Sequence, residues 1–131
     1  MSSLPDKTVC PCCSGKSFLD CCAPYLTGSR LPMSAVSLMR SRYSAYVLED
    51  EPYLLASWHP STRPADLKIE QEPRPRWLGL VIKRQVEMDE NHAIVEFVAR
   101  YKIHGRGFRL SETSRFERIE GRWFYLDGDL A

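Results

Sequence analysis

The chain has 131 residues, of which 44% are hydrophobic, so it is long enough for a single modest core. Its 18 basic and 17 acidic side chains give a formal net charge of +1, which excludes a whole-chain electrostatic argument for binding nucleic acid or an acidic partner. No apolar run is long enough to span a bilayer, and residues 1–9 lack the basic-then-apolar order of a signal peptide. Without an export signal, the five cysteines favour a reducing, cytoplasmic setting.

Residues 1–9 are predicted to be a loose lead-in to a cysteine cluster at residues 10–22, which holds all five cysteines. Zinc prefers a tetrahedron of four soft ligands, and thiolates serve well. The pair Cys10 and Cys12 is joined to the pair Cys21 and Cys22 through a turn at residues 14–16. We therefore predict a zinc site at Cys10, Cys12, Cys21 and Cys22. Four thiolates leave no open position for a substrate, so the site is predicted to be structural.

Two other kinds of cysteine chemistry remain open for this cluster. A disulfide framework is disfavoured by the odd number of cysteines and by the lack of a secretory signal. A redox dithiol is disfavoured because CxxC spacing on a strand-to-helix turn is absent, and redox or iron chemistry is the main alternative to zinc. The fifth cysteine, Cys13, is either a bystander or an alternative ligand.

The same residues resemble the SEC-C motif, which ends the bacterial secretion ATPase and occurs in many smaller proteins. The resemblance rests on Cys10-Pro-Cys12, Ser14-Gly15-Lys16, the aromatic Phe18 and Cys21-Cys22. It implies zinc binding by Cys10, Cys12, Cys21 and Cys22. The chain departs from the motif where it has Cys13 in place of the usual glycine and lacks further lysines after residue 16. In the secretion ATPase the SEC-C motif contacts partner proteins, so the resemblance suggests a similar role for this segment.

Beyond the cluster, residues 24–32 have the composition of a linker. A helix is predicted over residues 35–48, with its entry at Pro32 and Ser34 and with apolar side chains that recur at helical spacing. A second helix is predicted from Asp50, as an acidic cap, to Trp58, before Pro60. A short third helix is predicted at residues 65–69.

From Arg76 onward the pattern changes to a period of two. Strands are predicted at residues 77–87, 92–103, 108–118 and 123–126, joined by hairpin turns that contain Asn or Gly. Helices followed by an antiparallel meander indicate an α+β fold. A long twisted sheet would curl around the first helix and enclose a cone-shaped cavity.

This part resembles the nuclear-transport-factor-two-like superfamily, also called cystatin-like. The order of the cysteine knuckle, the segment 42–46, Trp58-His59-Pro60 and the segment 121–125 is more narrowly similar to the YchJ-like proteins of bacteria. The resemblance implies a zinc-binding segment at residues 1–31 and an α+β domain at residues 32–131, with helices packed on a curved sheet. It implies no particular activity, since the superfamily includes both enzymes and binding modules.

Glu112 and His59 are the two candidates for acid–base chemistry in such a cavity. Glu112 lies on the same face of its predicted strand as Phe108 and Phe116. If this face points inward, its carboxylate lies in an apolar pocket. The alternatives, which we favour, are a reversed parity or an ion pair with Arg40 or Arg42. His59 can shuttle a proton, although such a histidine more often forms a structural hydrogen bond.

Two functions from different classes follow from these features. The first is a protein-interaction or adaptor module that docks to a protein partner through its structural zinc knuckle. The alternative is a small-molecule-binding protein or acid–base enzyme that uses the cavity. An open cavity with convergent polar groups would favour the second, and a cavity filled by aromatic rings would exclude it. Nucleic-acid binding is not expected.

Overall fold

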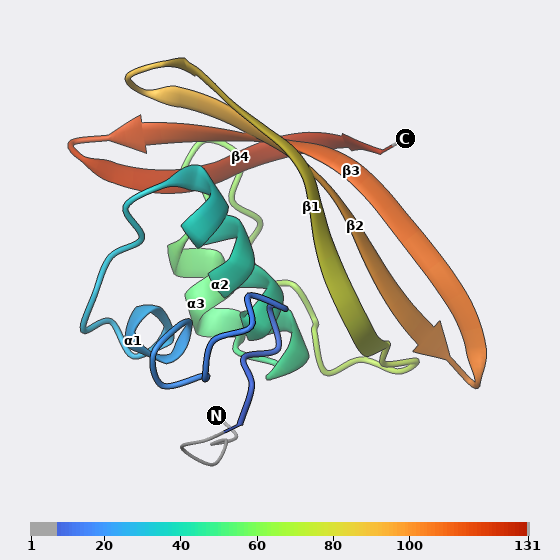
Figure 1. The fold of residues 1–131 in the computed structure, drawn as a ribbon. Helices are drawn as coiled ribbons and strands as arrows, with labels where there is room; N and C mark the ends of the chain where they lie inside the picture. The colour runs from blue at the N-terminus through green and yellow to red at the C-terminus, as the bar shows by residue number, and fades with distance from the viewer. Residues whose placement is uncertain (1–7, 131) are drawn as a thin grey trace.

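The computed structural model describes residues 8–130, so the prediction for residues 1–7 lies outside the described part of the chain. An α+β arrangement is confirmed, with helices packed against one curved antiparallel sheet (Figure 1). The helices are α1 (Ala23–Leu26), α2 (Ala35–Val47) and α3 (Glu51–Ala56). The strands are β1 (Arg76–Asp89), β2 (His92–Ile103), β3 (Arg106–Ile119) and β4 (Arg122–Leu130).

The two longer predicted helices begin where the sequence places their caps. The Ser34 hydroxyl accepts a hydrogen bond from Ser37 N, and the Asp50 carboxylate accepts one from Tyr53 N. Each cap satisfies a backbone donor that the first helical turn leaves unpaired. The short α1, which falls in the predicted linker, was missed.

The predicted third helix at residues 65–69 is wrong. This segment has no helical turns, and Ile69 N donates to the side chain of Glu51 at the start of α3 instead of to its own backbone. A helix of five residues forms few hydrogen bonds of its own, so the contact with Glu51 outweighs it. Within residues 8–130, no helix is both long and apolar enough to cross a membrane.

The sheet has the strand order β1-β2-β3-β4, with every neighbouring pair antiparallel. Two of its hairpin turns, at His104-Gly105 and at Glu120-Gly121, place both residues at positive φ of 49–81°. This is the backbone of the type I′ turn, whose twist matches that of the flanking strands. The four predicted strands are therefore confirmed, although β4 extends to Leu130 rather than to Leu126.

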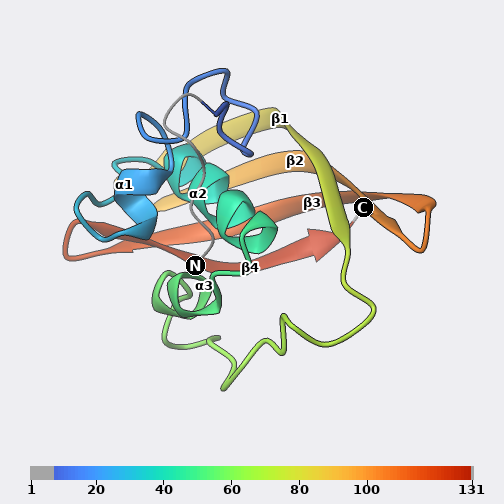
Figure 2. The same cartoon turned by 90° about the horizontal axis from the view of Figure 1, so that it is seen from below.

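The sheet curls so that α2 lies in its concave face (Figures 1 and 2). On β2, Ala93, Val95, Phe97 and Ala99, which share one face of the strand, are buried. They share one core with Leu38 of α2, and three of the cysteines belong to the same cluster of buried side chains. The N-terminal cysteine segment thus packs on the side of α2 and contributes to the core of the molecule.

Candidate metal centre and adjacent pocket

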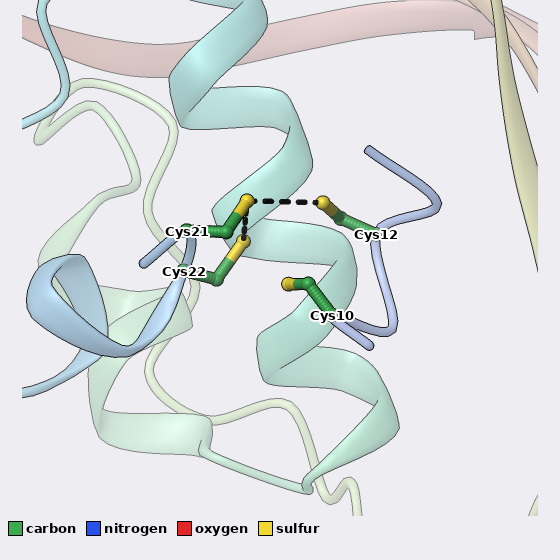
Figure 3. Close-up of side chains that lie close together, drawn as sticks. All are labelled: Cys10, Cys12, Cys21 and Cys22. Atoms are coloured by element: carbon green, nitrogen blue, oxygen red, sulfur yellow. Dashed lines mark hydrogen bonds between the residues drawn. The ribbon is translucent and has the colours of Figure 1, made fainter. Parts of the chain in front are cut away.

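Four of the five cysteines converge on one point. The Sγ atoms of Cys10, Cys12, Cys21 and Cys22 all lie within 4.8 Å of one another. Figure 3 shows the four side chains pointing toward one another from two segments beside α2. Three are buried and Cys21 is partly exposed. This is the ligand set that the sequence predicts; binding of a metal by these residues stays a prediction.

A tight turn brings the two cysteine pairs together. The backbone of Cys10 donates to Lys16 O at 2.9 Å, and Val9 forms an isolated bridge with Ser17. The turn needs left-handed backbone at Gly15, whose φ is 87° and which carries no Cβ to oppose it. The chain then reaches Cys21 and Cys22, and Cys22 stands at the N-terminal end of α1.

The thiols of Cys12, Cys21 and Cys22 hold their protons unequally. Hydrogen bonds from Cys10, and next from Cys22, lower the pKa of Cys12 far below its ordinary value. Burial raises the pKa of Cys21 to about 11, and the hydrogen bond with Cys10 raises that of Cys22 further still. Thiols this close to one another ionise together only in the presence of a positive charge, which a divalent metal ion supplies.

The cysteine segment is fastened to α2 by side chains one helical turn apart. Arg40 Nη1 donates to Cys12 O at 2.7 Å, and the Ser44 hydroxyl lies 3.5 Å from Cys10 Sγ. Residues four apart share one face of a helix. One face of α2 therefore supports the metal centre.

Cys13 lies apart from the other four cysteines. Its Sγ accepts a hydrogen bond from Leu80 N at 3.4 Å, on the outer edge of β1. Its own backbone has a φ of 65°, in the left-handed region. The structure thus places Cys13 between the cysteine turn and the edge of the sheet, where its thiol pairs with a backbone donor of an edge strand.

A pocket of about 230 Å³ lies between another face of α2 and the concave face of the sheet. Its walls are mostly apolar and aromatic, but they include a guanidinium, a carboxylate and tyrosine hydroxyls. The lining residues are Met39, Arg42, Tyr43, Tyr46, Trp58, Trp77, Phe97, Ala99, Leu110, Glu112, Ser114 and Tyr125. Several of them are partly exposed, which gives the pocket an opening to solvent.

Arg42 is the buried cation of this pocket, with an exposed fraction of 3%. Its Nη1 donates to Leu54 O at 2.8 Å and to Ser57 Oγ at 2.7 Å. Its guanidinium carbon lies 5.0 Å from the ring centre of Trp58 and 4.6 Å from that of Tyr125. Burial lowers the pKa of Arg42, although an arginine remains protonated at neutral pH.

Glu112 lines the pocket, so the favoured prediction that its side chain faces away from the cavity is wrong. The other favoured prediction, an ion pair with Arg40 or Arg42, is wrong as well. Ser114 and Phe116, which share the parity of Glu112 on β3, are fully buried. Its Oε2 accepts hydrogen bonds from Ser114 Oγ at 2.5 Å and from the Tyr125 hydroxyl at 3.4 Å. Among residues 8–130, neither arginine of α2 forms a salt bridge with it.

His59 is not among the residues that line this pocket. Its Nε2 lies 2.9 Å from Glu117 Oε1, and its Nδ1 accepts a hydrogen bond from Ser61 N at 3.0 Å. Glu117 also contacts His92 Nε2 at 3.1 Å, and His92 Nδ1 reaches Asp89 at 2.9 Å. These side chains form a hydrogen-bonded chain away from the pocket.

The His92 imidazole should titrate above its ordinary pKa of 6.5, because Asp89, and after it Glu117, stabilise its protonated form. A raised folded-state pKa contributes stability below pH 6.5 that is lost as the pH rises through the folded value. We expect Glu117→Gln to lower the pKa of His92 in an NMR titration, and Glu120→Gln, in the neighbouring turn, to leave it unchanged. Equal values in the wild type and in Glu117→Gln would contradict this assignment.

Comparison with known proteins gives the same architecture. A family model described as the YchJ middle NTF2-like domain matches residues 34–128. The solution structure of a SEC-C motif containing protein from Rhodopseudomonas palustris superposes with a TM-score of 0.83 at 32% identity, covering 93% of this chain and 98% of that one. The crystal structure of a SEC-C motif containing protein from Psychrobacter arcticus gives 0.81 at 27% identity, covering 96% and 84%.

Curated relatives match over almost the whole chain. A UPF0225 protein of Ralstonia nicotianae is 53% identical over 131 residues, covering 92% of this chain and 90% of its own length. A UPF0225 protein of Bordetella pertussis is 48% identical over 126 residues, covering 92% of both. The predicted nuclear-transport-factor-two-like fold is confirmed. With its four converging cysteines and its curved sheet around α2, the chain belongs to the YchJ-like family, UPF0225.

Proposed function

We propose that zinc is the ion held by Cys10, Cys12, Cys21 and Cys22, and that its role is structural. Four thiol ligands suit zinc and fill its tetrahedral shell. The centre is mostly buried against α2, where a substrate would have no access to the ion. The free thiols also fit the reducing environment of the cytoplasm, which we keep as the proposed location.

We propose further that the protein binds a small molecule in the pocket between α2 and the sheet. The observation that carries this proposal is Arg42, a buried cation beside an open, mostly apolar pocket and without a carboxylate partner among residues 8–130. Burying a charge is costly, and a buried charge that forms no ion pair is kept mainly where function needs it. In an enzymatic form of this proposal, Glu112 is the acid–base candidate, and His59 would have to act outside the pocket.

A screen of single-ring compounds by two-dimensional NMR tests the pocket. Binders should shift resonances of pocket residues such as Ala99 and Ser114. The variant Leu110→Trp fills the pocket, and we expect it to abolish these shifts. Phe108→Trp is the matched control, because Phe108 has the same parity on β3 but lies outside the lining set. Shifts that persist in Leu110→Trp would place the compounds elsewhere and contradict the proposal.

A protein-interaction or adaptor role remains a second candidate. What supports it is a pair of exposed apolar side chains in the cysteine segment itself, Val9 and Leu19. A partner protein that docks on the knuckle would cover these side chains, and the structural zinc would hold their backbone in place.

A further inference from the structure

The pocket holds a cation and an anion in fixed positions without pairing them. On the cation side, Arg42 uses Nη1 for two hydrogen bonds to α3 and the residue after it, and its guanidinium lies against the rings of Trp58 and Tyr125. These contacts come from two different elements, so the guanidinium has little freedom to turn. Its remaining donors are on a side chain that lines the pocket.

On the anion side, two residues hold the carboxylate of Glu112, and a third leaves it room. Ser114 and Tyr125 each donate a hydrogen bond to Oε2. Gly128 pairs with Ser114 across the β3–β4 ladder, and a Cβ at this glycine would stand 2.8 Å from Cδ of Glu112. A side chain at residue 128 would therefore displace the carboxylate. The absence of a side chain at Gly128 leaves the space that Glu112 occupies.

This arrangement restricts the charge of an occupant. The formal charges of Arg42 and Glu112 cancel, so the attraction of an anion to the guanidinium is offset by its repulsion from the carboxylate, and the reverse holds for a cation. Both groups are only partly screened by solvent, which makes such repulsion stronger than on an open surface. An uncharged molecule avoids both repulsions if it offers an acceptor to Arg42 and a donor to Glu112.

The size and the walls of the pocket restrict the rest of the molecule. A volume of 230 Å³ equals roughly the liquid volume of eight water molecules, which suits a ligand with one ring. Met39, Phe97 and Leu110 give most of this surface an apolar character, so an extended polar ligand would lose its hydration without replacement.

We propose that the pocket, in the binding role proposed above, takes an uncharged, single-ring molecule that carries a carbonyl acceptor next to an N–H donor, as in a primary amide or a lactam. The carbonyl oxygen accepts from Arg42 and the N–H donates to Glu112. The ring lies against the apolar walls. Specificity for such a ligand then comes from Arg42 as donor and Glu112 as acceptor, which form no ion pair with each other.

Four probes of similar size test this ligand class: benzamide, benzoate, benzylamine and toluene. Each is titrated into the zinc-loaded full-length protein and followed by the NMR shifts of pocket residues. We expect benzamide to bind at least about tenfold more tightly than either charged probe, a difference well within titration precision. The apolar probe should bind more weakly than benzamide because it leaves both polar groups unpaired.

The variant Glu112→Gln supplies a second and independent readout. It removes the negative charge and keeps the shape of the side chain, so benzoate should gain about tenfold or more in affinity through the uncompensated Arg42. Glu96→Gln is the matched control, because Glu96 is exposed on β2 and outside the pocket, and it should keep the wild-type order of the probes.

The outcomes separate the two proposals. If benzoate or benzylamine equals benzamide in the wild-type protein, or if Glu112→Gln does not favour benzoate, the ligand class is overturned while the pocket remains a binding site. If none of the four probes shifts the pocket residues at millimolar concentration, the proposed binding function fails together with its ligand class.

Discussion

Chelation of the metal should unfold the N-terminal segment and lower the melting temperature of the whole protein by at least about 10 °C. The reason is that residues 10–22 have almost no core of their own, apart from three buried thiols and Phe18. Structural zinc contributes on the order of 10 kcal/mol to the folding of isolated zinc-finger peptides. Part of this free energy stabilises the contacts with α2, which the loss of the metal would release. Zinc content by elemental analysis and melting by circular dichroism, before and after a chelator, measure both effects.

Serine substitutions at the cysteines provide the matched controls. Cys22→Ser should lose the metal and reproduce the chelator effect, because it removes a buried ligand. Cys13→Ser should retain about one zinc per chain and nearly the full melting temperature, since Cys13 lies outside the converging set. A purified protein without metal, or a site that is lost with Cys13→Ser, would contradict the four-ligand assignment.

Truncation of Phe116 to alanine should destabilise the protein by about 3–5 kcal/mol. Phe116 is 1% exposed on β3, packs edge-on against Tyr125 at 5.8 Å between ring centres, and lies opposite Ala93 on β2. The surrounding backbone is fixed by ladder hydrogen bonds on both sides, so the cavity cannot collapse easily. Domains of this size have a total stability of about 5–15 kcal/mol, so the loss would be a large fraction. Urea unfolding followed by tryptophan fluorescence measures it.

The comparison variant is Phe124→Ala on β4. Phe124 is partly exposed and contacts His59 and Arg122 on the other side of the sheet. We expect it to cost less than about 1.5 kcal/mol, since little buried area is lost. Equal losses for the two variants would show that the face of β3 that carries Phe116 is not the main core face, which would also change the assignment of Glu112 to the pocket.

The fold was predictable to the extent that local patterns determine it. The period of two, with turn residues between the runs, gave four strands in the right places, and Ser34 and Asp50 gave two helix starts. The end of β4 was not predictable in this way. Asp127-Gly128-Asp129 has the composition of a turn, but β3 offers a partner strand, and Arg115 binds both aspartates at 2.5–2.7 Å. A long-range contact overrides the local preference there.

The candidate site was predictable in part for the same reason. The cysteine spacing was enough to single out the four cysteines that converge, because two pairs joined by a short turn can bring their thiols together. The parity of Glu112 was visible, but whether it faces inward depends on the whole sheet. Arg42 is four residues after Leu38 and three after Met39, which places it on the apolar side of α2. That position in the sequence indicated that the Arg42 side chain would be buried. Its lack of an ion pair follows only from the three-dimensional arrangement.

The position of α2 between the metal centre and the pocket has a thermodynamic consequence. Arg40 and Ser44 contact the cysteine segment, and Arg42 lines the pocket two residues away from each on the same helix of 13 residues. A displacement of this helix changes both sites at once. By thermodynamic linkage, an occupant of the pocket that strengthens metal binding by a given free energy is itself bound more tightly by the same free energy when the metal is present. The chelator concentration at which the protein loses half of its metal would therefore shift with pocket occupancy.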